Sequence, residues 1–430
     1  MSALTRRRFA ELLAAGGPLA VFAEAAFAES DLERLLRPSR RPPPFHEGEN
    51  YWSEIREQFF LPEDLAFFNA ANLCPAPIPV VEALLERTRR LDRDPSPQVK
   101  GELQQERELV RQKLAAYLRV SPEEIVITRN TSEANNLVSS GLDLGPGDEV
   151  VIFSDNHPSN HAAWREKARR FGFSVKVVEQ VNPHPGADYY LEAFSRAMTS
   201  RTRVVAFTHV TNTAGDLLPA KELCALAREK GALSLVDGAQ SFGVLDVDLS
   251  DMQPDFYTGS AHKWPCGPRE AGLLYVNRQV HDRIYPTIVS LYGGAVGISR
   301  VLEAMGQRDE PAMIAFGAAI DFQLEIGRAA VEKRAYELRN AAVEELRRIP
   351  GVKLWSHPDP ARSGAVVTFL PGNLDPRKLA EALYREHGIV LAARGGEDRP
   401  GLRLSPHLYN LHAEVERTVA ALRRYLSTGL

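Results

Sequence analysis

Six short segments of almost uninterrupted apolar residues constrain the fold of this chain most strongly: 125–128, 149–154, 204–208, 232–236, 256–257 and 271–276. A strand that is apolar at nearly every position must be covered on both of its faces. Several of these segments are separated by stretches with apolar residues at helical spacing. Strands that alternate with helices favour parallel βαβ units. The sequence therefore predicts an α/β fold in which a mostly parallel sheet lies between helices.

The chain after Pro311 departs from this pattern and predicts a second, smaller domain. One helical pattern runs over 312–348 and stops at Pro350-Gly351, since proline and glycine both end helices. The last 80 residues contain short apolar segments at 352–355, 365–370 and 402–404 and two helical stretches, the second with Asn410 as its N-cap. We expect a large domain over 51–310, with its N-terminal segment packing on the small lobe, and a long connecting helix plus a small α+β domain over 311–430.

The charge balance and the cysteine content exclude several classes of protein. The 430 residues include 52 Lys and Arg against 56 Asp and Glu, which gives a net charge of −4 and no basic surface typical of nucleic-acid binding. No run of about 18 apolar residues is present that would insert stably into a membrane. Cys74, Cys224 and Cys266 are not spaced as metal ligands. We therefore expect no nucleic-acid partner, no stable membrane insertion and no bound metal.

The first 28 residues have the features of an export signal. The basic segment Thr5-Arg6-Arg7-Arg8-Phe9 precedes a mildly apolar stretch and then Ala26-Phe27-Ala28. This order is typical of a secretory signal, and the paired arginines are typical of the twin-arginine signal, which exports folded proteins. The proline-rich residues in 29–50 predict an extended linker. We expect the twin-arginine export machinery as a partner and a periplasmic or secreted location. The alternative is a basic amphipathic helix on a cytoplasmic protein.

The segment 236–275 contains a carboxylate and an amine that suit a cofactor. Asp237 ends an apolar segment, and Lys263 follows another one 26 residues later. Ligands of open α/β sheets bind at the carboxyl ends of strands. A lysine can form the Schiff base with pyridoxal phosphate (PLP), and a carboxylate can keep the pyridine nitrogen protonated so that the ring acts as an electron sink. The two residues are therefore candidates for the centre of a PLP site.

Seven further polar residues stand just beyond predicted strands or beside the lysine and fit the other groups of this cofactor: Thr131, Ser132, His157, Asn212, Gln240, Ser260 and His262. The first two open a helix, where N–H groups and hydroxyls bind phosphate, and the serine and histidine next to Lys263 are further donors for it. The asparagine and the glutamine can hydrogen-bond the ring oxygen, and His157 offers a flat ring for stacking. Each residue alone could be structural, but their joint placement favours one site.

Four motifs together carry a family resemblance: Asp237-Gly-Ala-Gln240, Ser260-Ala-His262-Lys263, His157-Pro-Ser-Asn160 and Leu402-Arg403-Leu404-Ser405-Pro406. They resemble motifs of the class V aminotransferase family of PLP enzymes, over nearly the whole chain from Phe67 onward. The resemblance implies PLP fold type I, with a mostly parallel seven-stranded sheet in the large domain. It also implies Lys263 as the Schiff-base lysine, Asp237 as the partner of the pyridine nitrogen and His157 as the stacking residue. The other six residues take the phosphate and ring-oxygen roles given above.

The same resemblance assigns a substrate residue and a partner. Arg403 matches the arginine that clamps the α-carboxylate of the substrate, a task that suits a bidentate guanidinium. It could instead be an ordinary ion-pair partner. The resemblance also implies a homodimer, with Tyr292-Gly293-Gly294 and Gln307 as candidate contributors to the site of the neighbouring subunit.

The sequence constrains the reaction less than the cofactor. A cysteine desulfurase needs a thiol on a mobile loop shortly before the carboxylate-binding arginine, and residues 391–401 contain no cysteine. Cys266, close to Lys263, is more typical of small-residue packing. The segments 262–268 and 307–309 resemble the isopenicillin N epimerase branch. We expect an aminotransferase or an isopenicillin N epimerase-like enzyme acting on an α-amino acid or a related amine. The alternatives are a C–S or β-elimination lyase and a non-catalytic binding protein with the same fold.

Overall fold

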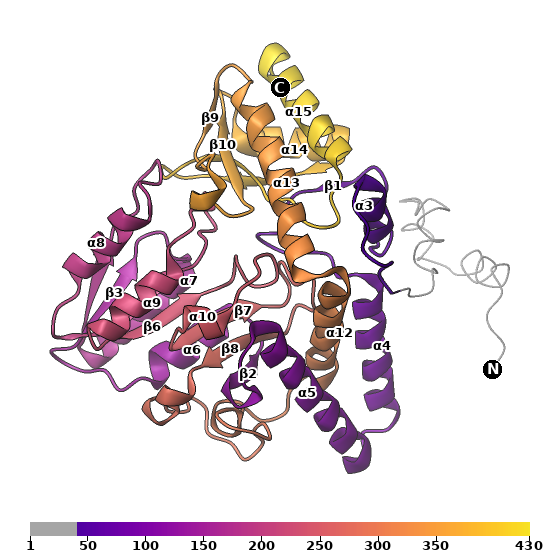
Figure 1. Cartoon of the computed structure of the whole chain (residues 1–430). Helices are drawn as coiled ribbons and strands as arrows, with labels where there is room; N and C mark the ends of the chain where they lie inside the picture. Colours follow the sequence, from indigo (N-terminus) through magenta and orange to yellow (C-terminus); the bar gives the residue numbers. More distant parts are fainter. Residues whose placement is uncertain (1–40) are drawn as a thin grey trace, which may run out of the picture. The chain divides into compact units, whose positions relative to one another are not determined.

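The computed structural model describes residues 41–430, which are coloured by sequence in Figure 1. The predicted signal, 1–28, and the first part of the predicted linker, 29–40, lie outside the described residues. Over 41–430, no helix combines the length and the apolar character that a membrane crossing requires.

A seven-stranded sheet forms the centre of the large part of the chain, with the strand order β2-β8-β7-β6-β5-β3-β4. Neighbouring strands from β7 to β4 are parallel, whereas β8 runs antiparallel to both β7 and β2. The strands are β2 (Ile125–Thr128), β3 (Glu149–Phe153), β4 (Ser174–Val178), β5 (Thr202–Thr208), β6 (Leu233–Asp237), β7 (Phe256–Ser260) and β8 (Gly272–Val276). The predicted α/β fold with a mostly parallel seven-stranded sheet is confirmed.

Both faces of this sheet are buried, which explains why most of its strands are predominantly apolar. In β2, Ile125 and Ile127 belong to one hydrophobic cluster and Val126 to another, and β3 and β5 alternate in the same way. The first cluster lies under α5 (Pro97–Leu118), α8 (Ala187–Ala197), α9 (Ala220–Glu229) and α12 (Glu310–Ile326). The second lies under α6 (Thr131–Gly141), α7 (Pro158–Phe171) and α11 (Ser299–Leu302).

The strand β4 is absent from the sequence-based expectation. It forms an edge of the sheet and pairs only with β3. Four of its five residues, Ser174 to Val177, are exposed or half-buried. An edge strand does not need the uninterrupted apolar run that identifies the buried strands, so the signal used for the others is missing here.

The predicted single helix over 312–348 is wrong. The structure has two helices, α12 and α13 (Arg328–Arg347), separated by Gly327 at φ 96°. A backbone with this positive φ is accessible to glycine at little cost, and it ends α12. The apolar pattern continues on both sides of the break, which is why the periodicity alone indicated one helix.

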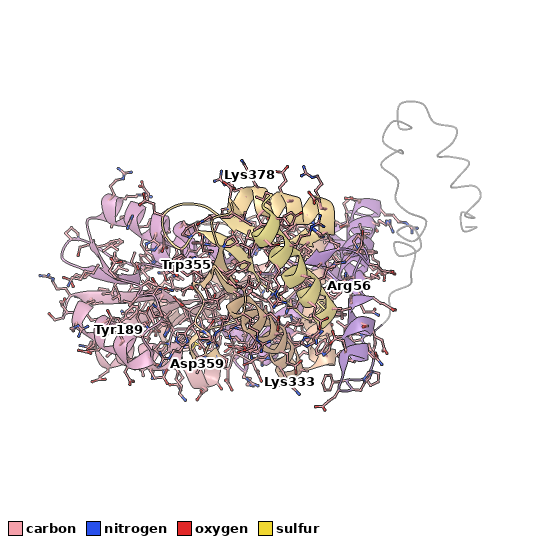
Figure 2. The ribbon with its side chains drawn as sticks, turned by 90° about the horizontal axis from the view of Figure 1, so that it is seen from above. Arg56, Tyr189, Lys333, Trp355, Asp359 and Lys378 are labelled. Atoms are coloured by element: carbon pink, nitrogen blue, oxygen red, sulfur yellow. The ribbon has the colours of Figure 1, made fainter. Side chains whose placement is uncertain are left out.

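The C-terminal part contains a four-stranded antiparallel sheet in the order β12-β13-β10-β9. Its elements are β9 (Val352–Leu354), β10 (Val367–Pro371), α14 (Pro376–His387), β12 (Ala392–Arg394), β13 (Gly401–Leu404) and α15 (His412–Thr428). A segment from the other end of the chain joins it, because β1 (Ala66–Phe67) pairs in parallel with β11 (Ile389–Val390). Figure 2 shows Tyr189 of α8 in the large part and Lys378 of α14 in this part with their side chains at the periphery.

The start of α15 differs from the prediction in one detail. Its N-cap is Leu411, so Asn410 is not the capping residue. Asn410 instead donates from Nδ2 to Glu414 Oε2 at 3.0 Å, and this carboxylate accepts the N–H of Leu411 at 3.0 Å. Glu414 therefore satisfies the backbone donor and Asn410 orients the carboxylate.

The remaining elements complete the large part of the chain. The helix α4 (Ile78–Arg93) packs against α12 and α5. The short elements are α3 (Glu49–Arg56), α10 (Leu249–Met252) and the 3₁₀ helices η2 (Pro122–Glu124), η3 (Arg278–Arg283) and η4 (Pro360–Arg362).

Candidate active site

Lys263 lies in the loop between β7 and β8, three residues after the end of β7. Its side chain is half-buried, and no residue in 41–430 hydrogen-bonds its Nζ. Burial lowers the pKa of Lys263 to about 8, because the opposing charge of Asp237 offsets the cost of burying the cation only in part. The structure therefore places here an amine that loses its proton far more readily than an ordinary lysine.

Asp237 is the last residue of β6 and is buried. Its Oδ2 accepts a hydrogen bond from Asn135 Nδ2 at 2.9 Å, and its Oδ1 accepts one from the N–H of Ala239 at 3.1 Å. Asn135, on α6, in turn accepts a hydrogen bond from Thr258 Oγ1 at 3.1 Å. The carboxylate is thus held in one orientation by a chain of buried partners, and sequence reasoning did not single out Asn135 as one of them.

The predicted phosphate-binding residues gather at the N-terminus of α6. Thr131 donates its backbone N–H to Ser260 Oγ at 2.9 Å, and the hydroxyls of Thr131 and Ser260 are 2.8 Å apart. Ser132 is exposed at the same helix end. The Nδ1 atom of His262 is buried and has no hydrogen-bond partner among residues 41–430. A helix N-terminus, hydroxyls and an unpartnered imidazole nitrogen together fit an anionic group.

His157 is the N-cap of α7 and follows β3. Its Nδ1 accepts the N–H of Ser159 at 3.3 Å, which leaves the proton of the neutral ring on Nε2. Although the side chain has exposed surface, partial burial and then the charge of Lys263 lower the pKa of His157. An uncharged ring near Lys263 is compatible with the predicted stacking role, which stays a prediction.

Gln240 and Asn212 both lie near the site, but their side-chain amides differ in the number of hydrogen bonds that they make to residues 41–430. Gln240 Oε1 accepts the indole N–H of Trp264 at 2.8 Å, and Gln240 Nε2 donates to the carbonyl of Ala71 at 2.8 Å. One N–H of this amide remains for a ring oxygen. The side-chain amide of Asn212 has no hydrogen bond to any residue in 41–430, so it is the freer of the two donors.

Arg403, on β13, approaches the site from the C-terminal sheet and is 6% exposed. It donates to the carbonyl of Asn212 at 2.8 Å and to Asn69 Oδ1 at 3.2 Å, while its Nε is buried without a partner. Within the described chain no carboxylate forms an ion pair with it. Burial, together with the charge of Arg394, lowers the pKa of Arg403 to about 10. This guanidinium therefore lacks the counter-ion that a buried charge ordinarily has.

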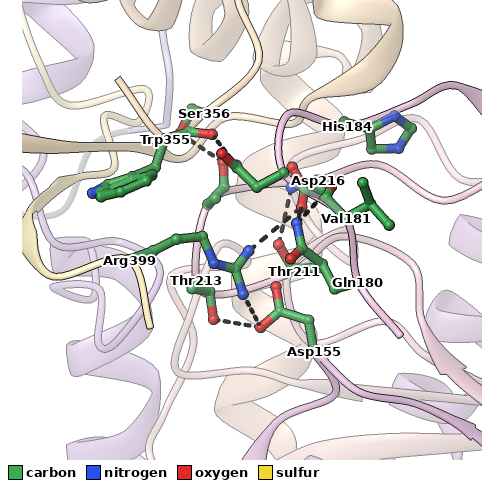
Figure 3. A network of polar contacts seen from close by, with 12 residues as sticks. Asp155, Gln180, Val181, His184, Thr211, Thr213, Asp216, Trp355, Ser356 and Arg399 are labelled. Carbon is green, nitrogen blue, oxygen red and sulfur yellow. Dashed lines mark hydrogen bonds and ion pairs between the residues drawn. The ribbon is translucent and has the colours of Figure 1, made fainter. Parts of the chain in front are cut away.

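A second buried arginine nearby has the opposite environment. Arg399 is bound by the carboxylates of Asp155 (3.0 Å), Asp216 (3.6 Å) and Asp398 (2.9 Å), as Figure 3 shows for the first two. Burial alone would lower the pKa of Arg399, but hydrogen bonds and charges of Asp398 and Asp155 raise it. Burial raises the pKa of Asp216 to about 7. These four residues, here called the Arg399 cluster, join the loop before β13 to the segments that follow β3 and β5.

Two buried cysteines lie close to the lysine loop. A ligand atom of each of Cys74, Cys266 and His407 lies within 4.8 Å of the other two. Burial raises the pKa of Cys266 well above its usual range, with a contribution from Cys74, so its thiol is protonated. A protonated, fully buried thiol agrees with the packing role predicted for Cys266. The expectation that no metal is bound stays a prediction.

The structure brings together the ten residues predicted for the site. Nine of them lie at or just after the carboxyl ends of β2, β3, β5, β6 and β7, which all run in the same direction, and Arg403 faces them from β13. Sequence reasoning missed Asn135 and the Arg399 cluster. The only signal for the cluster in the sequence is indirect, namely that Asp155 stands two residues after the end of β3.

Comparison with known proteins agrees with this geometry. Residues 67–418 match the model of the aminotransferase class-V family. The chain belongs to this family. It is 33% identical over 391 residues to isopenicillin N epimerase of Amycolatopsis lactamdurans, covering 86% of this chain and 98% of that protein. It is 30% identical over 406 residues to a probable cysteine desulfurase of Methanothermobacter thermautotrophicus, covering 87% of this chain and 98% of that protein.

A solved structure supports the fold. The structure of a C-DES variant with glycine covalently linked to the PLP cofactor superposes with a TM-score of 0.80 at 25% identity. The match covers 86% of this chain and 98% of that chain. The predicted family, its fold and its class of enzyme are thereby confirmed.

Proposed function

We propose that this chain is a PLP-dependent enzyme that removes the α-proton of an α-amino acid or a related amine and acts as an aminotransferase or an isopenicillin N epimerase-like enzyme. One observation carries the proposal. Arg403, a buried guanidinium that pairs with no carboxylate of residues 41–430, lies near Lys263, an amine of lowered pKa, and the charge of Arg403 contributes to that lowering. An α-amino acid supplies the missing carboxylate and places its α-carbon next to a base.

The cofactor predicted from the sequence is pyridoxal phosphate, in agreement with the family and with the PLP in the related C-DES structure. The residues present fit it. Asp237 presents an oriented carboxylate, and among residues 41–430 neither Lys263 Nζ nor the buried His262 Nδ1 near the N-terminus of α6 has a hydrogen-bond partner. When bound, PLP takes up the negative charge that forms at the α-carbon of an amino acid.

In this proposal, different residues bind the cofactor, bind the substrate and accept the proton. Thr131, Ser132, Ser260 and His262 hold the phosphate, and Asp237 keeps a proton on the pyridine nitrogen. Arg403 binds the α-carboxylate and thereby fixes the orientation of the α-carbon. Lys263, with a pKa of about 8, accepts the α-proton on Nζ near neutral pH, where a lysine of ordinary pKa would be almost fully protonated.

A C–S or β-elimination lyase is the second candidate, and the likeness to C-DES favours it. A related structure describes C-DES as a cystine C–S lyase with cysteine persulfide as its product. A desulfurase that forms a persulfide on its own loop cysteine is disfavoured, since residues 391–401 contain no cysteine.

The absorbance spectrum of the purified holoenzyme tests the proposal. We expect a PLP band that changes when one of a panel of L- and D-amino acids is added. Conversion to the pyridoxamine form indicates transamination. Chiral analysis and pyruvate release separate epimerisation from elimination. A protein that shows no PLP band even after the cofactor is added would contradict the proposal as a whole.

We also propose a homodimer. The segment that precedes Gly293 and Gly294 exposes large apolar side chains, with Val289 at 85%, Leu291 at 96% and Tyr292 at 68% exposure. Contiguous exposed apolar residues of this kind are typical of an interaction surface. Equilibrium sedimentation should give twice the monomer mass, and an active monomer would exclude the dimer.

Export by the twin-arginine route is a further proposal, and it rests on residues 1–28 alone. The route carries folded proteins, so the enzyme would cross the membrane with its cofactor bound. Replacing all three arginines of this segment, as R6K, R7K and R8K together, should keep the protein inside the cell in a fractionation experiment. Unchanged export of this variant would favour another route.

A further inference from the structure

Three side chains of the kinds that bind zinc meet next to the loop that carries Lys263. Cys74 lies between β1 and α4, Cys266 belongs to the lysine loop itself, and His407 lies between β13 and α15. One ligand atom of each lies within 4.8 Å of a ligand atom of the other two. All three side chains are buried. Because they come from distant parts of the chain, their spacing in the sequence could not indicate that they meet.

The imidazole of His407 has one nitrogen that the protein leaves without a partner. Its Nε2 lies 2.6 Å from the carbonyl oxygen of Trp264, which can only accept, so Nε2 carries the proton and donates it. Nδ1 is then the nitrogen with the lone pair, and this buried atom has no hydrogen-bond partner within residues 41–430. A metal-binding histidine typically donates its other ring N–H to a carbonyl or carboxylate oxygen. His407 therefore has the tautomer of a metal ligand.

The two thiols make only weak contacts with protein atoms. Cys74 Sγ lies 3.8 Å from the carbonyl oxygen of Ala70 and 3.6 Å from Tyr409 Oη. Cys266 Sγ lies 3.6 Å from the carbonyl oxygen of Trp264. A thiol is a weak hydrogen-bond donor, so these contacts stabilise the sulfur atoms little. Cys266 also has a φ of 56°, a conformation that favours glycine, and strained backbone of this kind clusters at functional sites.

The charges of the three groups suit a divalent ion. Two thiolates neutralise one Zn²⁺ and an imidazole adds a ligand without charge, so the complex has no net charge in a place where an unpaired charge is costly. Zinc is bound by cysteine and histidine in structural sites and takes four ligands there. The hydroxyl of Tyr409, next to Cys74 Sγ, is a candidate for the fourth position.

We propose that Cys74, Cys266 and His407 bind a Zn²⁺ ion that fixes the position of the lysine loop. On binding, two S–H bonds break, two Zn–S bonds and one Zn–N bond form, and two protons pass to the solvent without any change of oxidation state. The ion joins the loop of Lys263 to the segments before α4 and after β13. Cys74 also contacts this loop through its N–H, which donates to the carbonyl of His262 at 2.8 Å. This inference does not depend on the proposed function.

The metal content of the holoenzyme tests the inference. The protein is isolated under reducing conditions from cells grown with added Zn²⁺, and it is dialysed against a chelator before elemental analysis. We expect about one Zn²⁺ per chain, because an ion enclosed by buried ligands leaves the folded protein slowly. A zinc-sensitive dye should detect this ion only after the protein is unfolded. A wild-type protein that retains no zinc after dialysis would overturn the inference.

Variants locate the ion. C74S and H407Q should each lower the zinc content at least about tenfold, since even the loss of a group that only orients a ligand weakens metal binding by about 10- to 100-fold. C224S is the matched control, because Cys224 is also buried but packs in the cluster under α9, and it should keep the zinc. Circular dichroism verifies that each variant is folded. Unchanged zinc in folded C74S and H407Q would overturn the inference.

A cobalt-substituted protein gives a readout that needs no substitution in the chain. Protein from cells grown with Co²⁺ in place of Zn²⁺ should absorb at longer wavelengths than PLP does, as tetrahedral Co²⁺ bound by thiolates does. Bound Co²⁺ without these bands would contradict the assignment of the thiols as ligands.

A disulfide between Cys74 and Cys266 is the competing interpretation, because thiols in oxidising compartments often pair. A disulfide, however, would not involve His407. Protein that is unfolded directly from cells in the presence of an alkylating reagent should carry the label on both cysteines. A Cys74–Cys266 disulfide found by peptide mass spectrometry would overturn the inference.

Discussion

The Arg399 cluster and the surroundings of Arg403 each contain a buried arginine, but only the Arg399 cluster provides carboxylates that compensate its charge. The two arginines are four residues apart and almost equally buried, at 5% and 6% exposure. Arg399 is bound by three carboxylates, whereas the hydrogen-bond acceptors that Arg403 meets within residues 41–430 are one carbonyl and one amide oxygen. Their pKa values accordingly move in opposite directions, upward for Arg399 and down to about 10 for Arg403.

This difference separates a structural ion cluster from a ligand site. A buried charge costs several kcal/mol unless partners compensate it. The Arg399 cluster finds that compensation within the chain. Arg403 and Lys263 have no ion pair with any carboxylate of residues 41–430, so folding leaves two cationic groups to be satisfied by a cofactor or a substrate. Perturbed groups without internal partners are a physical mark of function.

The largest expected effect is that of K263A. The site proposed around Lys263 predicts that turnover of any amino acid that alters the cofactor spectrum falls by at least about 10³-fold, because the base at the α-carbon is lost. Stability should not fall, since Lys263 makes no hydrogen bond within 41–430. Steady-state kinetics and thermal unfolding measure both quantities. Substantial remaining turnover would remove Lys263 from the mechanism.

R399Q should act on stability. Removing the cation leaves Asp155 and Asp216 buried and unpaired, which should lower the free energy of unfolding by about 3–5 kcal/mol. Urea denaturation measures the change, and R385Q on the surface serves as the charge-matched control. If R399Q were as stable as the wild type, the cluster would not be the structural element described here.

R403Q, in contrast to R399Q, should weaken substrate binding without lowering the free energy of unfolding. Loss of the contact to the α-carboxylate should weaken substrate binding by about 10- to 100-fold. The free energy of unfolding should stay the same or rise, because an uncompensated buried charge is removed. Spectral titration and urea denaturation test the two parts. A loss of stability comparable to that of R399Q would show that Arg403 has a structural partner.

A further prediction concerns pH and needs no substitution. The pKa of Lys263 is lowered to about 8. Below pH 8, each increase of one pH unit therefore raises the fraction of neutral amine, the form that reacts with PLP, about tenfold. The rate at which the apoenzyme takes up PLP should rise from pH 6 to 8 and then level off. Stopped-flow absorbance measures this rate. A rate that keeps rising to pH 10 would indicate a lysine of ordinary pKa.

The sequence was sufficient for the parts of the molecule that local chemistry determines. Buried strands require uninterrupted apolar runs, and the carboxyl ends of parallel strands meet at one edge, so Asp237, Lys263 and Thr131 could be assigned to a common site. The edge strand β4 and the break at Gly327 could not be found in this way. Solvent removes the apolar requirement in the first case, and a single glycine does not interrupt the apolar pattern in the second.

Partnerships between distant residues were beyond sequence reasoning for a different reason. Asn135 lies on the same helix as the residues assigned to the phosphate, and nothing in its position along the sequence shows that its side chain orients Asp237. Arg399 and its carboxylates come from three separate segments, and nothing in their spacing shows that they meet.

The pairing of β1 with β11 has a consequence for the order in which the chain is made. Ala66 lies opposite Ile389, so β1, which is synthesised early, can pair with β11 only after most of the chain has been translated. Ala66 and Phe68 belong to the hydrophobic cluster of the C-terminal part, and both are fully buried. A polypeptide that ends before residue 389 would therefore leave the apolar side chains of Ala66 and Phe68 exposed to solvent, so an incomplete product would differ from the full chain by an exposed apolar segment near its N-terminus.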